Sequence, residues 1–209
     1  MARSLLSNLC AGGLALAAGL VSSAQEAGRD SQELVLESGP LSFNAQTNLF
    51  EMDAPRIKQG GLSIAADKAV ATGVEFDATS EWRFTGNVHI EAGNAVMEAA
   101  SAVFTFDQER LSRGQLEGAP ASFTHNDPAR KKPLTGTANR MLYDYIARTL
   151  RMTGNVSLQR DQTEVQGCDI IYNLTTEGFS SGDSDCENPF RLRRVVPDSS
   201  RTDGASPPQ

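Results

Sequence analysis

Residues 82–90 read WRFTGNVHI and residues 150–158 read LRMTGNVSL, so one stretch with a central Thr-Gly-Asn-Val occurs twice in this sequence. In both copies apolar residues alternate with polar ones, which is the pattern of a β-strand with one buried face and one solvent-exposed face. The glycine in mid-strand removes side-chain bulk from the buried face, as a bend or a close approach of another backbone requires. The sequence therefore predicts one supersecondary unit that is used at least twice.

The same alternation recurs in short runs from Leu34 onward, and Gly, Asn, Asp or Pro interrupts it at intervals typical of an all-β protein. Two alanine-rich windows, residues 65–71 and 95–102, are compatible with a helix, but neither carries a capped helical stripe, so we predict strands there as well. Repeated bent strands build a curved sheet. We predict an all-β fold, an open β-jelly roll (β-taco) of repeated antiparallel strands, with an ordinary β-sandwich as the nearest competitor.

The first 24 residues are predicted to be a secretory signal peptide. Arg3 supplies a positive charge, residues 11–21 are apolar, and residues 22–24 are the small residues that signal peptidase requires. A retained membrane anchor and lipidation at Cys10 are the alternatives. We expect cleavage and export, a single β domain over residues 25–196, and a disordered tail over residues 197–209, which are rich in Ser, Asp, Pro and Gly.

Charge and cysteine content narrow the class of partner and the compartment. A formal net charge of −7 argues against a nucleic-acid partner, because phosphate contacts need a basic face. Two cysteines, Cys168 and Cys186, follow the predicted signal peptide. An oxidising compartment favours a disulfide between them, and two unpaired thiols are the alternative.

The sequence contains one formal match to an enzyme motif. Residues 178–182, GFSSG, match the G-x-S-x-G motif of serine hydrolases, but His89 and His125 both precede Ser180, whereas that motif needs a catalytic His farther along. We therefore predict a turn there and no enzyme. The histidines and cysteines lack metal-finger spacing and no phosphate-binding glycine loop is present, so we expect no metal and no cofactor. The basic cluster at residues 191–194 is predicted to be a solvated strand end, with contact to lipid phosphate as the alternative.

Five blocks of sequence carry a resemblance to a known family. They are IAADKA (64–69), FTGNVHI (84–90), LEGAPASF (116–123), GTANRMLYD (136–144) and LRMTGNV (150–156). In order and spacing they resemble the OstA-like family, which comprises the LptA-like periplasmic lipopolysaccharide-transport proteins and the organic-solvent-tolerance N-terminal domain. The resemblance implies a β-jelly roll that carries lipopolysaccharide acyl chains in its apolar interior and stacks end to end with similar domains.

The resemblance also implies a place in the periplasm and a set of partners. The expected partners are lipopolysaccharide and the OstA-like domains of the inner-membrane clip and the outer-membrane translocon. The predicted cleavage of the signal favours the soluble bridge protein over the clip component. Head-to-tail self-association is expected through exposed strand edges, for which residues 34–43 and 170–174 are the candidates.

The predicted lipid-binding residues are the apolar members of the repeated stretch, which would line the interior. They are Trp82, Phe84, Val88, Ile90, Leu150, Met152, Val156 and Leu158. Because the protein and lipopolysaccharide are both anionic, the acyl chains must supply the affinity, at ~0.8 kcal/mol for each CH₂ buried. Ordinary core packing is the alternative for each residue. The alternative function is that of a structural envelope protein that uses the same sheet for protein contacts only.

Overall fold

The computed structural model describes residues 33–73, 79–108, 110–182 and 190–194. The predicted signal peptide (1–24) and tail (197–209) lie outside the described residues, and so does Cys186. The part of the chain that is described forms strands and turns without a helix. In particular, it contains no helix with the length and hydropathy needed to cross a bilayer.

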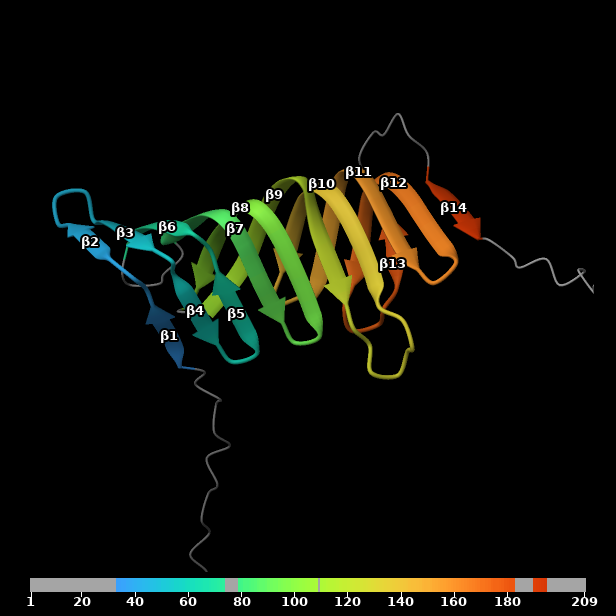
Figure 1. Cartoon of the computed structure of the whole chain (residues 1–209), viewed down its shortest axis with the longest axis horizontal. Helices are drawn as coiled ribbons and strands as arrows, with labels where there is room; N and C mark the ends of the chain where they lie inside the picture. Colours follow the sequence, from blue (N-terminus) through green and yellow to red (C-terminus); the bar gives the residue numbers. More distant parts are fainter. Residues whose placement is uncertain (1–32, 74–78, 109, 183–189, 195–209) are drawn as a thin grey trace, which may run out of the picture. The chain divides into compact units, whose positions relative to one another are not determined.

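The strands join into one 14-stranded antiparallel sheet (Figure 1). They are β1 (Leu34–Glu37), β2 (Leu41–Asn44), β3 (Leu49–Asp53), β4 (Arg56–Gln59), β5 (Leu62–Ala65), β6 (Lys68–Thr72), β7 (Glu81–Ala92), β8 (Ala95–Asp107), β9 (Arg110–His125), β10 (Leu134–Asp144), β11 (Thr149–Arg160), β12 (Thr163–Asn173), β13 (Phe179–Ser181) and β14 (Arg191–Arg194). The prediction of an all-β open sheet is confirmed, and the two alanine-rich windows contribute to strands, chiefly β6 and β8.

The long strands β7 to β12 lie side by side in chain order, and their ladders shift register near the middle of each strand. In β7 the shift falls on Gly86 and Asn87, whose φ angles are 76° and 45°. In β11 it falls on Gly154 and Asn155, with φ angles of 74° and 50°. Gly and Asn are the residues that most readily adopt this left-handed conformation. The repeated Thr-Gly-Asn-Val therefore encodes a bulge that bends the strand, as its glycine predicted.

The bulges divide the sheet into two layers, and Figure 1 shows the fainter strand segments of one behind those of the other. We call the layer that contains β2, β3, β6 and β13 the first layer, and the layer that contains β1, β4, β5 and β14 the second layer. In β7, residues 81–85 pair with β6 and residues 89–92 pair with β5. In β12, residues 170–172 pair with β13 and residues 163–166 pair with β14. Each long strand thus contributes one half to each layer.

Inward-facing side chains of both layers pack into a single apolar core. The layers meet again on the side away from the bulges, which we call the seam. There the rings of Phe123 and Tyr172, from the second and first layer, lie with their centroids 5.5 Å apart. His125 Nδ1 lies 2.8 Å from the Tyr172 hydroxyl, and the Leu111 backbone N–H donates to Gln59 Oε1 at 3.2 Å. Each of these contacts across the seam thus involves at least one side chain, and none of them is a pair of backbone groups.

Two sequence predictions for the C-terminal part are wrong. Residues 178–182 do not form an isolated turn, because Phe179–Ser181 form β13 and pair with residues 170–172. The chain reverses earlier, where the Asn173 side chain accepts hydrogen bonds from the backbone N–H groups of Thr175 and Thr176. The predicted free edge at residues 170–174 is consequently covered, and the edge strands at this end are β13 and β14. Residues 34–43, in contrast, do contain edge strands, β1 and the start of β2.

Candidate functional site

The eight residues predicted to bind lipid all face the interior, from β7 and β11. None of them is more than 3% exposed. The bulge in each strand distributes them evenly between the layers. The first layer contributes Trp82, Phe84, Leu150 and Met152, and the second contributes Val88, Ile90, Val156 and Leu158. The repeated sequence therefore lines both walls of one apolar interior.

The interior between these walls is occupied by the protein's own side chains. The ring of Phe84 packs edge-on against Phe104 with centroids 5.5 Å apart, and Trp82 packs against Phe106 at 5.7 Å. Both layers contribute to the same cluster, which runs from Met52 in β3 to Leu174 after β12. A ligand reaches the eight residues only when the layers separate at the seam or when it enters at one end of the sheet.

Near β12 the seam is held by two polar side chains, His125 and Tyr172, whose pKa values are shifted by burial. Burial lowers the pKa of His125 below its usual 6.5. Burial also raises the pKa of the Tyr172 hydroxyl above its usual 10.0. The hydrogen bond that joins these two residues across the layers is therefore one between neutral groups at pH 7. Beside it, Glu177 Oε2 accepts from Arg160 Nη1 at 3.0 Å and lies 2.8 Å from Arg130 Nε.

One pocket opens into the interior at this same end. Its volume is about 300 Å³, and its wall contains Leu158, one of the eight predicted residues. The side chains that line it come from β10, β11, β12, β13 and the turns beside them. They are Leu134, Leu158, Arg160, Asp161, Thr163, Val165, Tyr172, Glu177 and Phe179.

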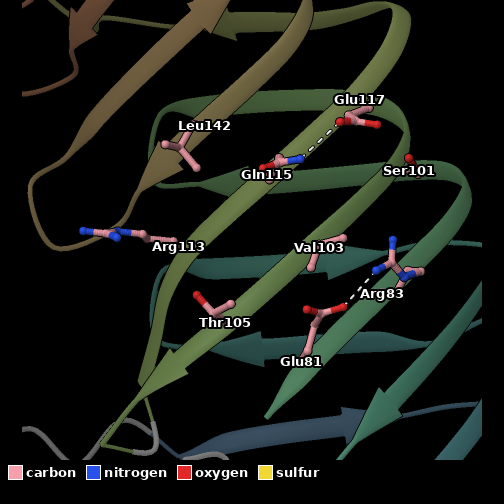
Figure 2. A pocket seen from close by; sticks show the side chains of 9 residues that line it. All are labelled: Glu81, Arg83, Ser101, Val103, Thr105, Arg113, Gln115, Glu117 and Leu142. Atoms are coloured by element: carbon pink, nitrogen blue, oxygen red, sulfur yellow. Dashed lines mark hydrogen bonds and ion pairs between the residues drawn. The ribbon is translucent and has the colours of Figure 1, made fainter. Parts of the chain in front are cut away.

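A larger hollow of about 480 Å³ lies on the outer face of the first layer and has a different character (Figure 2). Its lining contains four charged side chains, those of Glu81, Arg83, Arg113 and Glu117. Arg83 Nη2 lies 2.9 Å from Glu81 Oε1, and Gln115 Nε2 donates to Glu117 Oε1 at 3.1 Å, as the dashed lines in Figure 2 mark. This is the solvent-exposed face that the alternation predicted, and its four charged side chains all form ion pairs, with one another or with Asp144 and Arg140.

The edge strands expose apolar side chains at both ends of the sheet. Of the nine large apolar residues that are exposed in the described part of the chain, six lie in or next to β1, β2, β13 and β14. They are Val35, Leu41, Phe43, Phe179, Phe190 and Leu192. The charges at these ends also differ, because Glu33 precedes β1 and Glu37 ends it, whereas Arg191, Arg193 and Arg194 lie in β14. The basic cluster is an exposed strand, as predicted.

Residues 64–178, more than half of the chain, match the family described as LptA/(LptD N-terminal domain) LPS transport protein. The chain belongs to this family. The resemblance predicted from the five sequence blocks is confirmed. The matched range contains both copies of the repeat and most of the residues around the interior pocket, whereas the edge strands β1, β2, β13 and β14 lie outside it.

Two known proteins are similar to this chain, one in sequence and one in structure. The chain is 31% identical over 94 residues to the lipopolysaccharide export system protein LptA of Haemophilus influenzae, and the alignment covers 44% of this chain and 54% of that protein. The chain thus spans about half the length of this curated relative. The crystal structure of LptH, the LptA-homologous periplasmic component of the lipopolysaccharide transport device of Pseudomonas aeruginosa, matches with a TM-score of 0.51 at 11% identity, over 79% of this chain and 95% of that chain. This likeness shows the β-jelly-roll fold.

Sequence reasoning missed the residues that support the two bends of this LptA-family fold. A side chain at Gly86 would collide with the Asp67 carboxylate, and one at Gly154 would come within 3.0 Å of Asn139 Nδ2. The sequence does contain a pattern that could have indicated these supporting residues: Ala-Asp-Lys at residues 66–68 corresponds to Ala-Asn-Arg at residues 138–140. Both triplets precede a copy of Thr-Gly-Asn-Val, and both lie beside its glycine in the sheet.

Proposed function

We propose that this protein is a periplasmic component of the lipopolysaccharide transport bridge between the inner and outer membranes and holds acyl chains in its apolar interior. Membership of the LptA family supports the proposal, and the names of both relatives concern lipopolysaccharide export or transport. The observation that carries it is the interior itself. Two layers enclose one apolar cluster, and the repeated stretches line it from both sides.

The physical balance favours acyl chains over phosphate groups as the part that binds. The chain has a net charge of −7, so the anionic head of lipopolysaccharide gains little from it. Each methylene group moved from water into the interior contributes ~0.8 kcal/mol. Because side chains, such as His125 and Tyr172, hold the seam, the layers separate there without loss of a backbone ladder. Acyl chains then replace contacts that the interior side chains make with one another.

Site-specific photocrosslinking tests the proposal. A photoreactive benzoylphenylalanine replaces Val88 or Val156, which face the interior, and in matched controls it replaces Arg83 or Gln159, which face outward. We expect lipopolysaccharide adducts in the periplasm from the two interior positions and none from the two controls. Adducts from the outward positions alone, or none from any position, would contradict the proposal.

A structural envelope protein remains the second candidate, and one observation favours it. The interior is filled by the protein's own side chains, whereas apolar side chains are exposed at the edges. A protein of this kind would use the edges for contacts with other proteins and would bind no lipid. The crosslinking experiment separates the two candidates, because the structural role predicts no lipid adduct from Val88 or Val156.

We further propose end-to-end stacking with a second copy or with similar domains of the inner-membrane clip and the outer-membrane translocon. Neighbouring strands alternate in direction through both layers, so β14 runs opposite to β1 and β13 runs opposite to β2. A copy added at the end therefore continues both layers as antiparallel ladders. The arginines of β14 would then lie near Glu33 and Glu37 of the next copy. This heterologous contact does not close, so it builds a filament.

Analytical ultracentrifugation tests the stacking. Phe43→Ser removes an exposed apolar side chain from edge strand β2, and Ile146→Ser is the matched control, because Ile146 is 70% exposed in the β10–β11 turn. We expect Phe43→Ser to weaken self-association and Ile146→Ser to leave it unchanged. Equal sedimentation of the wild type and both variants as monomers at high concentration would rule out stacking through this edge.

Export and disulfide formation belong to the same proposal. We propose cleavage after Ala24, a domain over residues 25–196, and a disulfide between Cys168 and Cys186. Cys168 is disulfide-bonded, while Cys186 lies outside the described residues. N-terminal sequencing of the periplasmic protein and a free-thiol assay test both points. A mature protein that begins at Met1, or two reactive thiols, would contradict them.

A further inference from the structure

The pocket at the β12 end of the interior offers open space beside the apolar core. Its volume of about 300 Å³ corresponds to about ten water molecules in the liquid, so it accommodates a short segment of hydrocarbon but not a whole lipid. Leu134, Leu158 and Val165 form its apolar wall. Phe179, which is 43% exposed and stacks on Phe190 with centroids 6.0 Å apart, lies on the wall that faces solvent.

Arg160 gives this pocket an unusual polar feature. Its Nη1 bonds to Glu177, whereas Nε and Nη2 are buried and make no well-aligned hydrogen bond among the described residues, although the Tyr172 hydroxyl lies beside the guanidinium. Buried donors without a partner are rare in folded proteins and are costly to maintain. Solvent does not reach these two nitrogens. A ligand that brings an acceptor oxygen to them, with a small movement of the pocket wall, therefore supplies the well-aligned bond that the Tyr172 hydroxyl does not make.

The surrounding charges determine which kind of acceptor fits. Arg160 and Arg130 share Glu177, and Arg130 also lies 3.2 Å from Asp127 Oδ2. Asp161, which lines the pocket, pairs with Lys132 at 2.7 Å. Three cationic and three anionic side chains are thus gathered here. Because they balance, a fully charged phosphate or carboxylate gains no net attraction, whereas a neutral carbonyl oxygen satisfies the N–H donors without adding a charge.

We propose that this pocket is a subsite for one acyl chain, with Arg160 donating through Nε and Nη2 to the carbonyl oxygen of an ester or amide and the adjoining hydrocarbon lying against Leu134, Leu158 and Val165. The assignment rests on the proposed function, since it gives a place to one of the acyl chains carried by the interior. An apolar side chain from a second copy stacked at this end is the competing occupant. It would fill the space but leave both Arg160 nitrogens without a well-aligned hydrogen bond.

A pair of matched detergents tests the carbonyl contact. Sucrose monodecanoate has an ester carbonyl and decyl maltoside has an ether in its place, and both have neutral disaccharide heads. Calorimetric titration of the full-length exported protein, below the concentrations at which micelles form, measures both affinities. We expect the ester to bind about tenfold more tightly than the ether, as one hydrogen bond to a charged donor provides. Equal affinities would overturn the assignment, and so would tighter binding of decanoate than of the ester.

Three variants locate the effect. Arg160→Lys keeps the positive charge beside Glu177 but removes the planar set of donors, so we expect the preference for the ester to disappear. Arg140→Lys is the control, because Arg140 pairs with Glu117 on the exposed outer face, and it should keep the preference. Val165→Phe fills the pocket and should weaken binding of both detergents at least tenfold. A preserved preference in Arg160→Lys, or unchanged affinities in Val165→Phe, would place the binding elsewhere.

Photocrosslinking at Val88 in each variant distinguishes failure of the subsite from failure of the proposed function. If lipopolysaccharide adducts form at Val88 while the two detergents bind equally, the interior carries acyl chains and the assignment of the pocket is wrong. If no adduct forms in the wild type, the carrier function itself fails. Melting temperatures of all the variants confirm that each one is folded.

Discussion

The two copies of the repeated stretch bend in the same way but have different neighbours. Their Gly and Asn residues adopt nearly equal φ angles, 76° and 45° in β7 and 74° and 50° in β11. Beside β11 lies the continuous strand β10. Beside β7 lie two short strands instead: β6 pairs with the first half of β7 and β5 with the second half, and residues 66–67 separate the two short strands. The local sequence thus determines the bend, and the neighbouring segments determine whether it lies inside the sheet or near its end.

The supports of the two bends differ in chemistry as well. Beside β7, the backbone N–H of Asp67 donates to the Gly86 carbonyl at 2.9 Å, and Asn87 Nδ2 donates to the Asp67 carboxylate at 2.9 Å. Beside β11, the corresponding position is the neutral Asn139. The first bend is therefore held to a separate segment by specific hydrogen bonds, and we expect it to tolerate change less well than the second.

The largest expected effect comes from removal of the buried side chain just before each bend. Phe84 and Met152 are both fully buried, and Phe84 also packs edge-on against Phe104. Phe84→Ala should lower the free energy of unfolding by about 3–5 kcal/mol and Met152→Ala by about 2–4 kcal/mol, because the phenyl ring leaves the larger cavity. Urea denaturation measures both. A larger loss for Met152→Ala would show that the second copy, and not the first, is the more tightly packed.

A smaller effect is expected when each glycine becomes alanine. An L-residue in the left-handed conformation costs about 1–2 kcal/mol, so both Gly86→Ala and Gly154→Ala should reduce stability. Gly86→Ala should cost more, since its methyl group collides with the Asp67 carboxylate. Denaturation of Asp67→Ala, Gly86→Ala and the double variant forms a double-mutant cycle, in which we expect a favourable coupling between the two substitutions. Equal losses at Gly86 and Gly154 would mean that the different neighbours do not matter.

The smallest effect is a dependence of stability on pH that comes from one end of the seam. At the other end the contact is the amide of Gln59 with a backbone N–H, which does not titrate. His125 has a pKa below 6.5 in the folded protein because it is buried. As the pH falls below about 6.5, the unfolded chain takes up a proton that the folded protein resists, so stability decreases until the folded pKa is passed.

Unfolding experiments between about pH 7.5 and about pH 5 measure this dependence. His125→Gln should flatten the profile in this range relative to the wild type. His89→Gln is the control, because His89 lies on the outer face, where its ring contacts Glu91 and Glu98. A profile that His125→Gln leaves unchanged would assign the acid sensitivity to other groups.

The sequence predicted the features that depend on local pattern. Alternation along β7 and β11 placed residues such as Phe84 and Val156 inside, and Thr-Gly-Asn-Val predicted the bend, because conformational preferences of Gly and Asn act within one strand. Contacts between distant segments were not predictable in this way. Two examples are the hydrogen bond between His125 and Tyr172 and the pairing of β13 with β12. Both depend on how the whole sheet folds over, which cannot be predicted from a local sequence pattern.

The order of the strands has a consequence for how the protein folds. From β7 to β13 every strand pairs with the next one along the chain. Short loops of this kind close with little loss of chain entropy, and contacts between strands that are near in sequence favour rapid folding for a β protein. The sheet can therefore grow hairpin by hairpin from β7 and β8, with no distant segment required before the next hairpin adds. Until β13 and β14 are in place, however, the growing edge presents unpaired backbone groups, and this is the stage at which the chain is most prone to aggregate.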